Sequence, residues 1–89
     1  MILNVTDAAY KSEYTVSLNF NTGESVIIDL KDTIFNDSRK IFYPLRDLAY
    51  FKGFKIRLNT ITWDNEADFA PEFLLELGKK QTAAGLTNT

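Results

Sequence analysis

The sequence predicts an α+β domain in which a short helix and a C-terminal helix pack on an antiparallel sheet of about five strands. Polar and apolar residues alternate over residues 13–20 and 24–30, which is the pattern of half-buried strands. Over residues 69–77 the apolar residues recur at spacings of three and four, which is the pattern of an amphipathic helix. The chain has 89 residues, of which 45% are hydrophobic and 25% charged, and this suits one compact domain.

Three strands are expected in the first third of the chain. Residues 2–10 predict a less regular strand at an edge of the sheet, because Asp7 interrupts its apolar pattern. Residues 13–20 predict a regular strand, and residues 21–23, Asn-Thr-Gly, have the composition of a tight turn. The alternation resumes over residues 24–30, so these two strands should form a hairpin.

The middle of the chain predicts a loop followed by a short helix. Residues 31–40 are polar around Ile34 and Phe35, so we expect a loop held by one apolar contact. Pro44 suits the first turn of a helix, and Gly53 suits the position where that helix ends.

Two further short strands are predicted at residues 54–58 and 61–63. In the first strand the apolar residues should face the core, while Lys55 and Arg57 face the solvent. Trp63 lies in the second strand, where we expect it in the core or on a sheet face rather than as a platform for a ligand.

The C-terminal helix is expected to begin near Pro71 and to end at Gly78. Acidic residues lie at its positive N-terminal end and two lysines at its C-terminal end, so both placements suit the helix dipole. Residues 1–80 are therefore expected as a single α+β domain. Residues 81–89 are small and polar and are expected as a disordered tail.

The composition removes the side chains that enzymes use most often. Cysteine and histidine are both absent, so there is no thiolate nucleophile, imidazole base or Cys/His zinc site. Asp64, Glu66 and Asp68 have the alternate spacing of a calcium loop, but Phe69 and Leu75 stand where that loop needs a glycine and a bidentate glutamate. We therefore expect no enzymatic activity, no cofactor and no metal.

Nothing in the sequence predicts a membrane segment. No apolar run approaches the roughly 20 residues that a membrane-spanning helix needs. The first residues lack the basic and then apolar form of a signal peptide. We expect a cytoplasmic protein without a membrane partner.

Charge is distributed unevenly along the chain. The stretch from Arg39 to Arg57 has six bases against the single acid Asp47, a net charge of +5, whereas the remainder has four bases and eleven acids, a net charge of −7. Aromatic residues are interleaved with these bases, as on surfaces that bind nucleic acid. The simpler interpretation is a set of core aromatics with a solvated basic rim, and an acidic protein could also bind there. The bases considered for such a surface are Arg39, Lys40, Lys52, Lys55 and Arg57.

The run Thr-Ile-Thr-Trp-Asp-Asn-Glu-Ala-Asp-Phe-Ala-Pro-Glu-Phe-Leu at residues 60–74 resembles the closing signature of the bacterial family called domain of unknown function 2442. Residues 3–8, the hairpin end at residues 29–30 and Pro-Leu-Arg-Asp at residues 44–47 also resemble that family. The resemblance covers residues 2 to about 77. Its signature residues here are Trp63, Asp68, Pro71 and Glu72.

The resemblance implies a small α+β domain with an antiparallel sheet and no catalytic activity. Such domains occur alone or joined to a helix-turn-helix domain, and some are encoded beside small toxin-like proteins. We expect no appended helix-turn-helix in a chain of this length. The signature residues carry over in a structural role only. Asp64 and Glu66 replace the family's proline and glycine after Trp63, and a glycine would adopt a positive φ freely where a glutamate would not.

These observations lead to two hypotheses from different classes. The first is a non-enzymatic, antitoxin-like or regulatory module that binds a protein such as a small basic toxin, through acidic residues such as Glu13 and Glu24 or through an exposed strand edge. The second is a nucleic-acid-binding accessory domain that uses the basic stretch at residues 39–57. Pairing of two copies of the chain is compatible with either.

Overall fold

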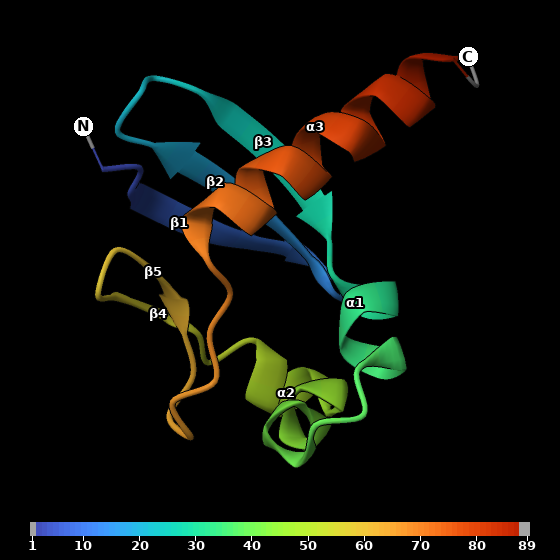
Figure 1. The fold of residues 1–89 in the computed structure, drawn as a ribbon. Helices are drawn as coiled ribbons and strands as arrows, with labels where there is room; N and C mark the ends of the chain where they lie inside the picture. Colours follow the sequence, from blue (N-terminus) through green and yellow to red (C-terminus); the bar gives the residue numbers. More distant parts are fainter. Residues whose placement is uncertain (1, 88–89) are drawn as a thin grey trace.

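The computed structural model describes residues 2–87 and has an α+β architecture (Figure 1). The elements are β1 (Val5–Ser12), β2 (Thr15–Phe20), β3 (Ser25–Asp29), α1 (Lys31–Asn36), the 3-10 helix η1 (Lys40–Arg46), α2 (Leu48–Phe51), β4 (Lys55–Arg57), β5 (Thr60–Thr62) and α3 (Pro71–Thr87). Strands β1, β2 and β3 form an antiparallel sheet in that order, and β4 and β5 form a separate antiparallel hairpin. The α+β class, the antiparallel pairing and the C-terminal helix are confirmed.

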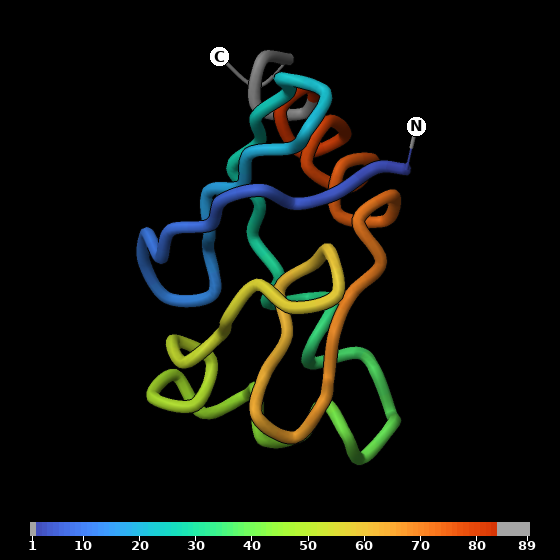
Figure 2. Tube along the Cα trace, turned by 90° about the vertical axis from the view of Figure 1, so that its left-hand side faces the viewer, coloured from blue at the N-terminus to red at the C-terminus, as the bar shows by residue number. Residues whose placement is uncertain are grey.

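The prediction of a single five-stranded sheet is wrong. The β4–β5 hairpin packs against β1, and among the described residues one backbone hydrogen bond joins them, from the Val5 N–H to the Asn59 carbonyl at 2.8 Å. Asn59 lies in the turn of the hairpin with φ at +75°, so the ladder does not continue from that bond. Figure 2 shows the sheet with α3 in one half of the molecule and the segments from α1 to β5 in the other.

The core lies between one face of the three-stranded sheet, α3 and the segments from η1 to β5. Val16, Leu18 and Ile28 point inward from alternate positions of β2 and β3 and are fully buried, as the alternation of the sequence predicts. Leu74 of α3 is fully buried in the same core cluster. Trp63 is also buried, as expected, and its indole N–H donates to the Phe51 carbonyl at 2.8 Å.

The C-terminal helix continues beyond Gly78, where the sequence predicted its end. A Cβ atom built on Gly78 would lie 2.6 Å from Cβ of Val26, so the missing side chain lets α3 approach β3 closely. This glycine therefore serves the contact between helix and sheet and not a helix terminus. Residues 81–87, expected in a disordered tail, belong to α3 in the structure, and residues 88–89 lie outside the described residues.

The middle segment is more helical than the sequence predicted. The expected loop at residues 31–40 contains α1, which buries Ile34. The single helix expected after Pro44 is instead η1 followed by α2. Asp47 separates the two with an extended backbone, and its carboxylate accepts a hydrogen bond from the Ala49 N–H at 3.0 Å, which caps α2.

The strand predicted over residues 54–58 is shorter and faces the solvent on both sides. Ile56 is 38% exposed and Leu58 is 89% exposed, so these residues do not face the core. Leu58 and Asn59 both have positive φ, +50° and +75°, and form a two-residue turn between β4 and β5. The apolar alternation was misleading here because its last residue lies in this turn.

Candidate functional site

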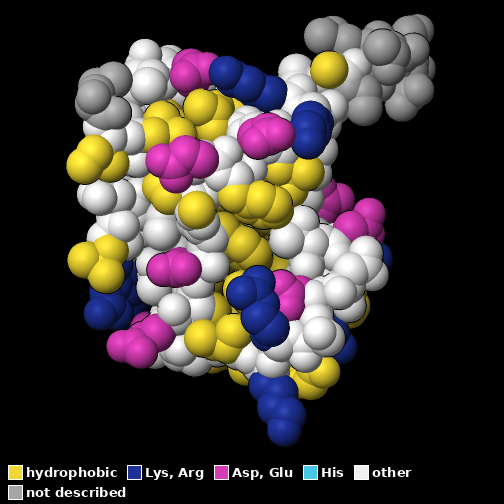
Figure 3. Space-filling view, in the orientation of Figure 1, with side chains coloured by type: hydrophobic (Ala, Val, Ile, Leu, Met, Phe, Trp, Pro, Cys, Tyr) yellow, Lys and Arg dark blue, Asp and Glu magenta, His cyan; other side chains and the backbone are white. Residues whose placement is uncertain are grey.

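An apolar groove of about 520 Å³ runs between the start of α3 and η1. Phe42 and Phe69 form its floor and are buried, whereas Ile41 and Phe73 are 41% and 42% exposed at its surface. Figure 3 shows hydrophobic side chains exposed along this strip, with charged side chains on both sides of it. We call it the aromatic groove. A contiguous exposed apolar surface of this kind marks a binding site more often than scattered apolar residues do.

Three phenylalanine rings are stacked along the aromatic groove. The ring centroids of Phe42 and Phe69 are 5.1 Å apart with an interplanar angle of 17°, and those of Phe69 and Phe73 are 5.9 Å apart with an angle of 22°. The Arg39 guanidinium lies over the Phe42 ring, with its Cζ 4.7 Å from the ring centroid. The stack therefore has a cation against its buried ring Phe42 and a partly exposed ring, Phe73, at its other end.

The charges that line the aromatic groove are predominantly acidic. Asp37 and Arg39 form an ion pair, with 2.7 Å between Oδ2 and Nη2, and their charges offset each other. The hydrogen bonds from Arg39 lower the pKa of the Asp37 carboxyl to about 2. Glu66 and Asp68 are exposed at the opposite side of the groove, and among the described residues neither has an ion-pair partner. The groove thus has two carboxylates that are available to a cationic ligand.

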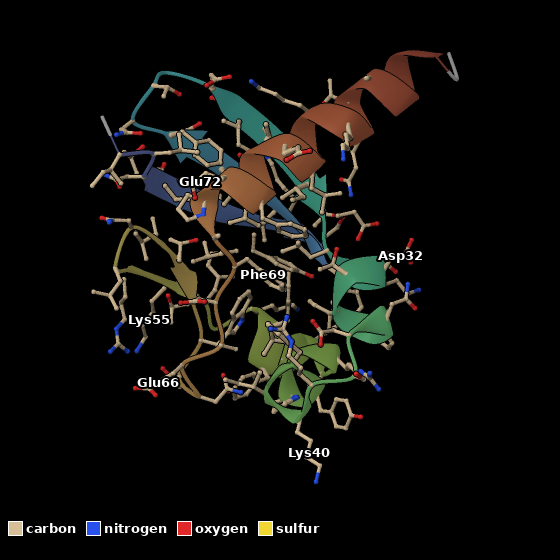
Figure 4. All side chains as sticks on the ribbon, in the orientation of Figure 1. Asp32, Lys40, Lys55, Glu66, Phe69 and Glu72 are labelled. Atoms are coloured by element: carbon tan, nitrogen blue, oxygen red, sulfur yellow. The ribbon has the colours of Figure 1, made fainter. Side chains whose placement is uncertain are left out.

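A tight turn after Trp63 positions this acidic side of the groove. The Trp63 N–H donates to the Ala67 carbonyl at 2.9 Å, and the Glu66 N–H donates back to the Trp63 carbonyl at 2.8 Å. Glu66 has φ at +70°, so it adopts the conformation for which the family's glycine is suited. The turn directs the Glu66 side chain outward, as Figure 4 shows.

Two side chains fix this turn segment to its neighbours. The Asn65 side-chain amide donates to the Ile41 carbonyl at 2.7 Å, which ties the turn to η1. The Thr60 hydroxyl donates to the Phe69 carbonyl at 2.5 Å, and this buried bond holds Phe69 against β5. The bond between Asn65 and Ile41 therefore connects the two walls of the aromatic groove, and the bond from Thr60 holds Phe69 in its place.

The family signature residues contribute to this region mainly through the backbone. Asp68 forms an isolated antiparallel bridge with Thr62, and its side chain lies at the groove. Pro71 is the first residue of α3 and Glu72 lies in its first turn. The purely structural role of these residues stays a prediction.

The bases singled out in the sequence are spread over several elements and are partly neutralised. Arg39 is paired with Asp37, as described above, and Lys55 lies 3.3 Å from the Asp64 carboxylate. The Lys52 amine lies 5.1 Å above the Tyr10 ring. Of the five bases singled out at residues 39–57, Lys40 and Arg57 have neither an ion pair nor a contact with an aromatic ring within residues 2–87.

The acids singled out in the sequence are not brought together. Glu13 lies in the turn before β2 and Glu24 in the turn after it, so they are separated by a strand of roughly 20 Å. Glu24 is also paired with Lys79 at 2.5 Å, and this hydrogen bond lowers the pKa of the Glu24 carboxyl.

The sequence did not predict the residues that form the aromatic groove. Phe69 and Phe73 were assigned to the core face of the C-terminal helix, and their spacing of four residues was the only signal that they lie side by side. Their stacking on Phe42 depends on how η1 meets α3, and no local pattern reports that contact.

Among the described residues, no group of three or more acidic, histidine or cysteine side chains could hold a metal ion. No helix in that part of the chain is long and apolar enough to cross a membrane.

Comparisons with known proteins identify a family and a fold. The family model described as protein of unknown function (DUF2442) matches residues 5–80. No curated protein matches the chain. A crystal structure from Nitrosomonas europaea, named "putative DNA binding protein", is similar with a TM-score of 0.74 and 19% sequence identity. The match covers 91% of this chain and 52% of that one, so this chain spans about half the length of that protein, and the likeness shows the fold alone.

Proposed function

The chain belongs to the DUF2442 family of proteins of unknown function, and we propose that it is a non-enzymatic interaction module whose aromatic groove binds a segment of a protein partner. The observation that carries this proposal is the stack of Phe42, Phe69 and Phe73, which leaves a ring 42% exposed in a groove of about 520 Å³. Aromatic side chains in such grooves supply much of the binding energy of protein interfaces.

The charge of the aromatic groove specifies the chemistry of the partner. Glu66, Asp68 and the exposed Phe73 line the same groove, and Arg39, the one cation among the described residues that line it, is already paired with Asp37. A segment with an apolar side chain next to lysine or arginine would fill the groove and pair with these carboxylates. A small basic protein fits this description, and an antitoxin-like role is the specific form of the proposal.

The proposal is tested by capture of partner proteins from a lysate of the source cell, with a tag placed after the last residue of the chain. The wild type is compared with Phe73→Asp and with the charge reversal Glu66→Lys/Asp68→Lys. Leu58→Asp is the matched control for the apolar change, because Leu58 is 89% exposed at a hairpin turn. Glu13→Lys/Glu24→Lys is the control for charge.

We expect one protein to be captured in stoichiometric amount by the wild type and both controls. Its affinity should fall about tenfold or more in each groove variant, since loss of a hot-spot contact at the centre of an interface costs about 2 kcal/mol or more and tenfold corresponds to about 1.4 kcal/mol. Equal capture by the groove variants and the wild type would refute the proposal. Loss in the Glu13→Lys/Glu24→Lys variant alone would assign binding to the ends of the hairpin instead.

Binding of nucleic acid is the second candidate function. It is favoured by the name of the solved structure with the similar fold and by Lys40 and Arg57, which remain available for phosphates. The ion pairs of Arg39 and Lys55 reduce the positive potential of the same stretch. The affinity of such a complex should fall steeply with salt because counterions are released. Absence of binding near physiological salt would reject this candidate.

A further inference from the structure

We infer that the free edge of β3 is a second binding surface, which takes one extended peptide strand through backbone hydrogen bonds. This inference is independent of the aromatic groove, because the edge lies where α3 leaves the sheet and not where α3 begins (Figure 1). It follows from the register of β3, from the position of Gln81 and from the course of α3.

The register of β3 shows which backbone groups face outward. The Phe20 N–H donates to the Glu24 carbonyl and the Leu30 N–H donates to the Tyr14 carbonyl, both at 2.9 Å. Backbone groups of successive residues point to opposite sides of a strand. The even-numbered residues of this stretch therefore bond to β2, and Ser25, Ile27 and Asp29 direct their N–H and carbonyl groups away from the sheet.

The outward groups of Asp29 are already satisfied by a side chain. The Asp29 N–H donates to Oε1 of Gln81 at 2.8 Å, and Nε2 of Gln81 donates to the Asp29 carbonyl at 2.9 Å. This amide makes the same pair of hydrogen bonds that a neighbouring strand would make. Within residues 2–87, the outward backbone groups of Ser25 and Ile27 have no such partner. We call these two residues the open edge.

The helix extends further than the sheet that it covers. A helix of 17 residues is about 25 Å long, whereas the outer strands of a three-stranded sheet lie only about 10 Å apart. Figure 1 shows α3 crossing β3 and continuing past it. An added strand would therefore lie beside β3 and beneath this overhanging end.

Two hollows adjoin the open edge, and Ser25, Val26 and Thr82 line both of them. The first has a volume of about 340 Å³ and extends to Lys79 of α3. The second, of about 380 Å³, extends to Ile27, which is 58% exposed on the outer face of the sheet. Alternate side chains of an added strand would face these two extensions, as in known cases of strand addition.

The position of α3 excludes a second copy of this chain as the occupant of an antiparallel edge-to-edge pair. Because Gln81 covers Asp29, two copies could pair only through Ser25 and Ile27 of each β3 strand. Such a pair would be centred on Val26, and its twofold axis would pass beside that residue. Gly78 places α3 directly over Val26. The two helices would then be separated by little more than the 4.8 Å between strands, whereas packed helices need 8–10 Å. The occupant is therefore a single extended segment of a partner, with an apolar β-branched side chain facing α3.

The experiment is selection of peptides from a phage-displayed library of random dodecapeptides on the full chain. Ile27→Pro removes the outward N–H without breaking a bond to β2, and proline is tolerated at such positions of edge strands. Ile27→Val is the matched control that keeps this N–H. Phe73→Asp removes the exposed ring of the aromatic groove, so that binding at the open edge and binding at the groove are tested separately.

We expect peptides with alternating apolar β-branched residues, whose affinity falls at least tenfold in Ile27→Pro and stays within twofold in Ile27→Val and Phe73→Asp. Amide exchange at Ser25 and Ile27 should be fast in the free protein and slowed at least tenfold by the peptide. Any of three results would overturn the inference. The selected peptides bind Ile27→Pro as well as the wild type, the selection yields no binders, or both amides exchange slowly in the free protein. If Ile27→Pro does not fold, a peptide N-methylated at its pairing positions replaces it, and undiminished binding of that peptide would be equally contrary.

Discussion

Replacement of Gly78 by alanine tests how α3 is seated on the sheet, because two effects of opposite sign compete at this position. Gly78 lies in the interior of a 17-residue helix. Helix propensity alone predicts that alanine stabilises the protein by about 1 kcal/mol. The new Cβ, however, would lie 2.6 Å from Cβ and 2.7 Å from Cγ2 of Val26. Carbon atoms in contact are normally about 3.5–4.0 Å apart, so α3 or Val26 has to move by about 1 Å.

Such a movement is costly because Val26 is 7% exposed and cannot turn freely within the packed sheet. Overpacking of a core costs roughly 1–3 kcal/mol. A shift of α3 would also strain the bonds between Gln81 and Asp29. We expect the unfavourable effect to be larger, so that Gly78→Ala lowers the free energy of unfolding by up to about 2 kcal/mol after the propensity gain is included.

The assay is urea unfolding of the wild type, Gly78→Ala, Val26→Gly and the double variant. In the Val26→Gly background Cβ and both Cγ atoms of residue 26 are absent, so the glycine-to-alanine change at position 78 should become neutral or stabilising, by up to about 1 kcal/mol. If Gly78→Ala raises the free energy of unfolding of the otherwise wild-type protein, the close approach of α3 and β3 is refuted.

Three further predictions concern the strained turns and the ion pair. Leu58→Asn/Asn59→Gly supplies the residues that the two-residue turn favours and should raise the free energy of unfolding by about 1 kcal/mol in urea; a loss would contradict the turn assignment. Glu66→Gly should stabilise by up to about 1 kcal/mol, because φ there is +70°, and unchanged or lower thermal stability would count against this strain. The Asp37 carboxyl has its pKa lowered from 3.8 to about 2 by hydrogen bonds from Arg39, so its stabilisation is complete above pH 3.8 and lost as the pH falls through 2. Asp37→Asn should therefore lose less stability than the wild type over this acid range, and equal losses would refute the assignment.

The sequence was sufficient for the hairpin of β2 and β3 because that hairpin depends on local patterns. Alternation places Val16, Leu18 and Ile28 in the core, and the structure buries all three. The end of α3 could not be predicted in the same way. Gly78 suits a helix terminus when only its neighbours in sequence are considered, and its contact with Val26 comes from a residue 52 positions earlier.

The sequence predicted less of the candidate site than of the fold. The distribution of charge along the chain indicated a basic surface at residues 39–57. A count of charges does not show that Arg39 and Lys55 are paired with carboxylates. The aromatic groove arises where Phe42 meets Phe69, and these residues are 27 positions apart. Stacking of this kind is a tertiary contact, so it becomes visible only when the elements are placed in space.

The Gln81 amide has a consequence for solubility. A sheet edge with a long row of unpaired backbone groups can recruit further chains and begin aggregation. By bonding to Asp29 at 2.8 and 2.9 Å, Gln81 shortens the available row to two residues. The backbone groups of Ser25 and Ile27 are sufficient to bind a strand that also contacts α3. They provide too few hydrogen bonds for a chain that pairs with the edge through its backbone alone. Gln81→Ala would lengthen the row and should make the protein prone to aggregate at high concentration, although no core contact is lost.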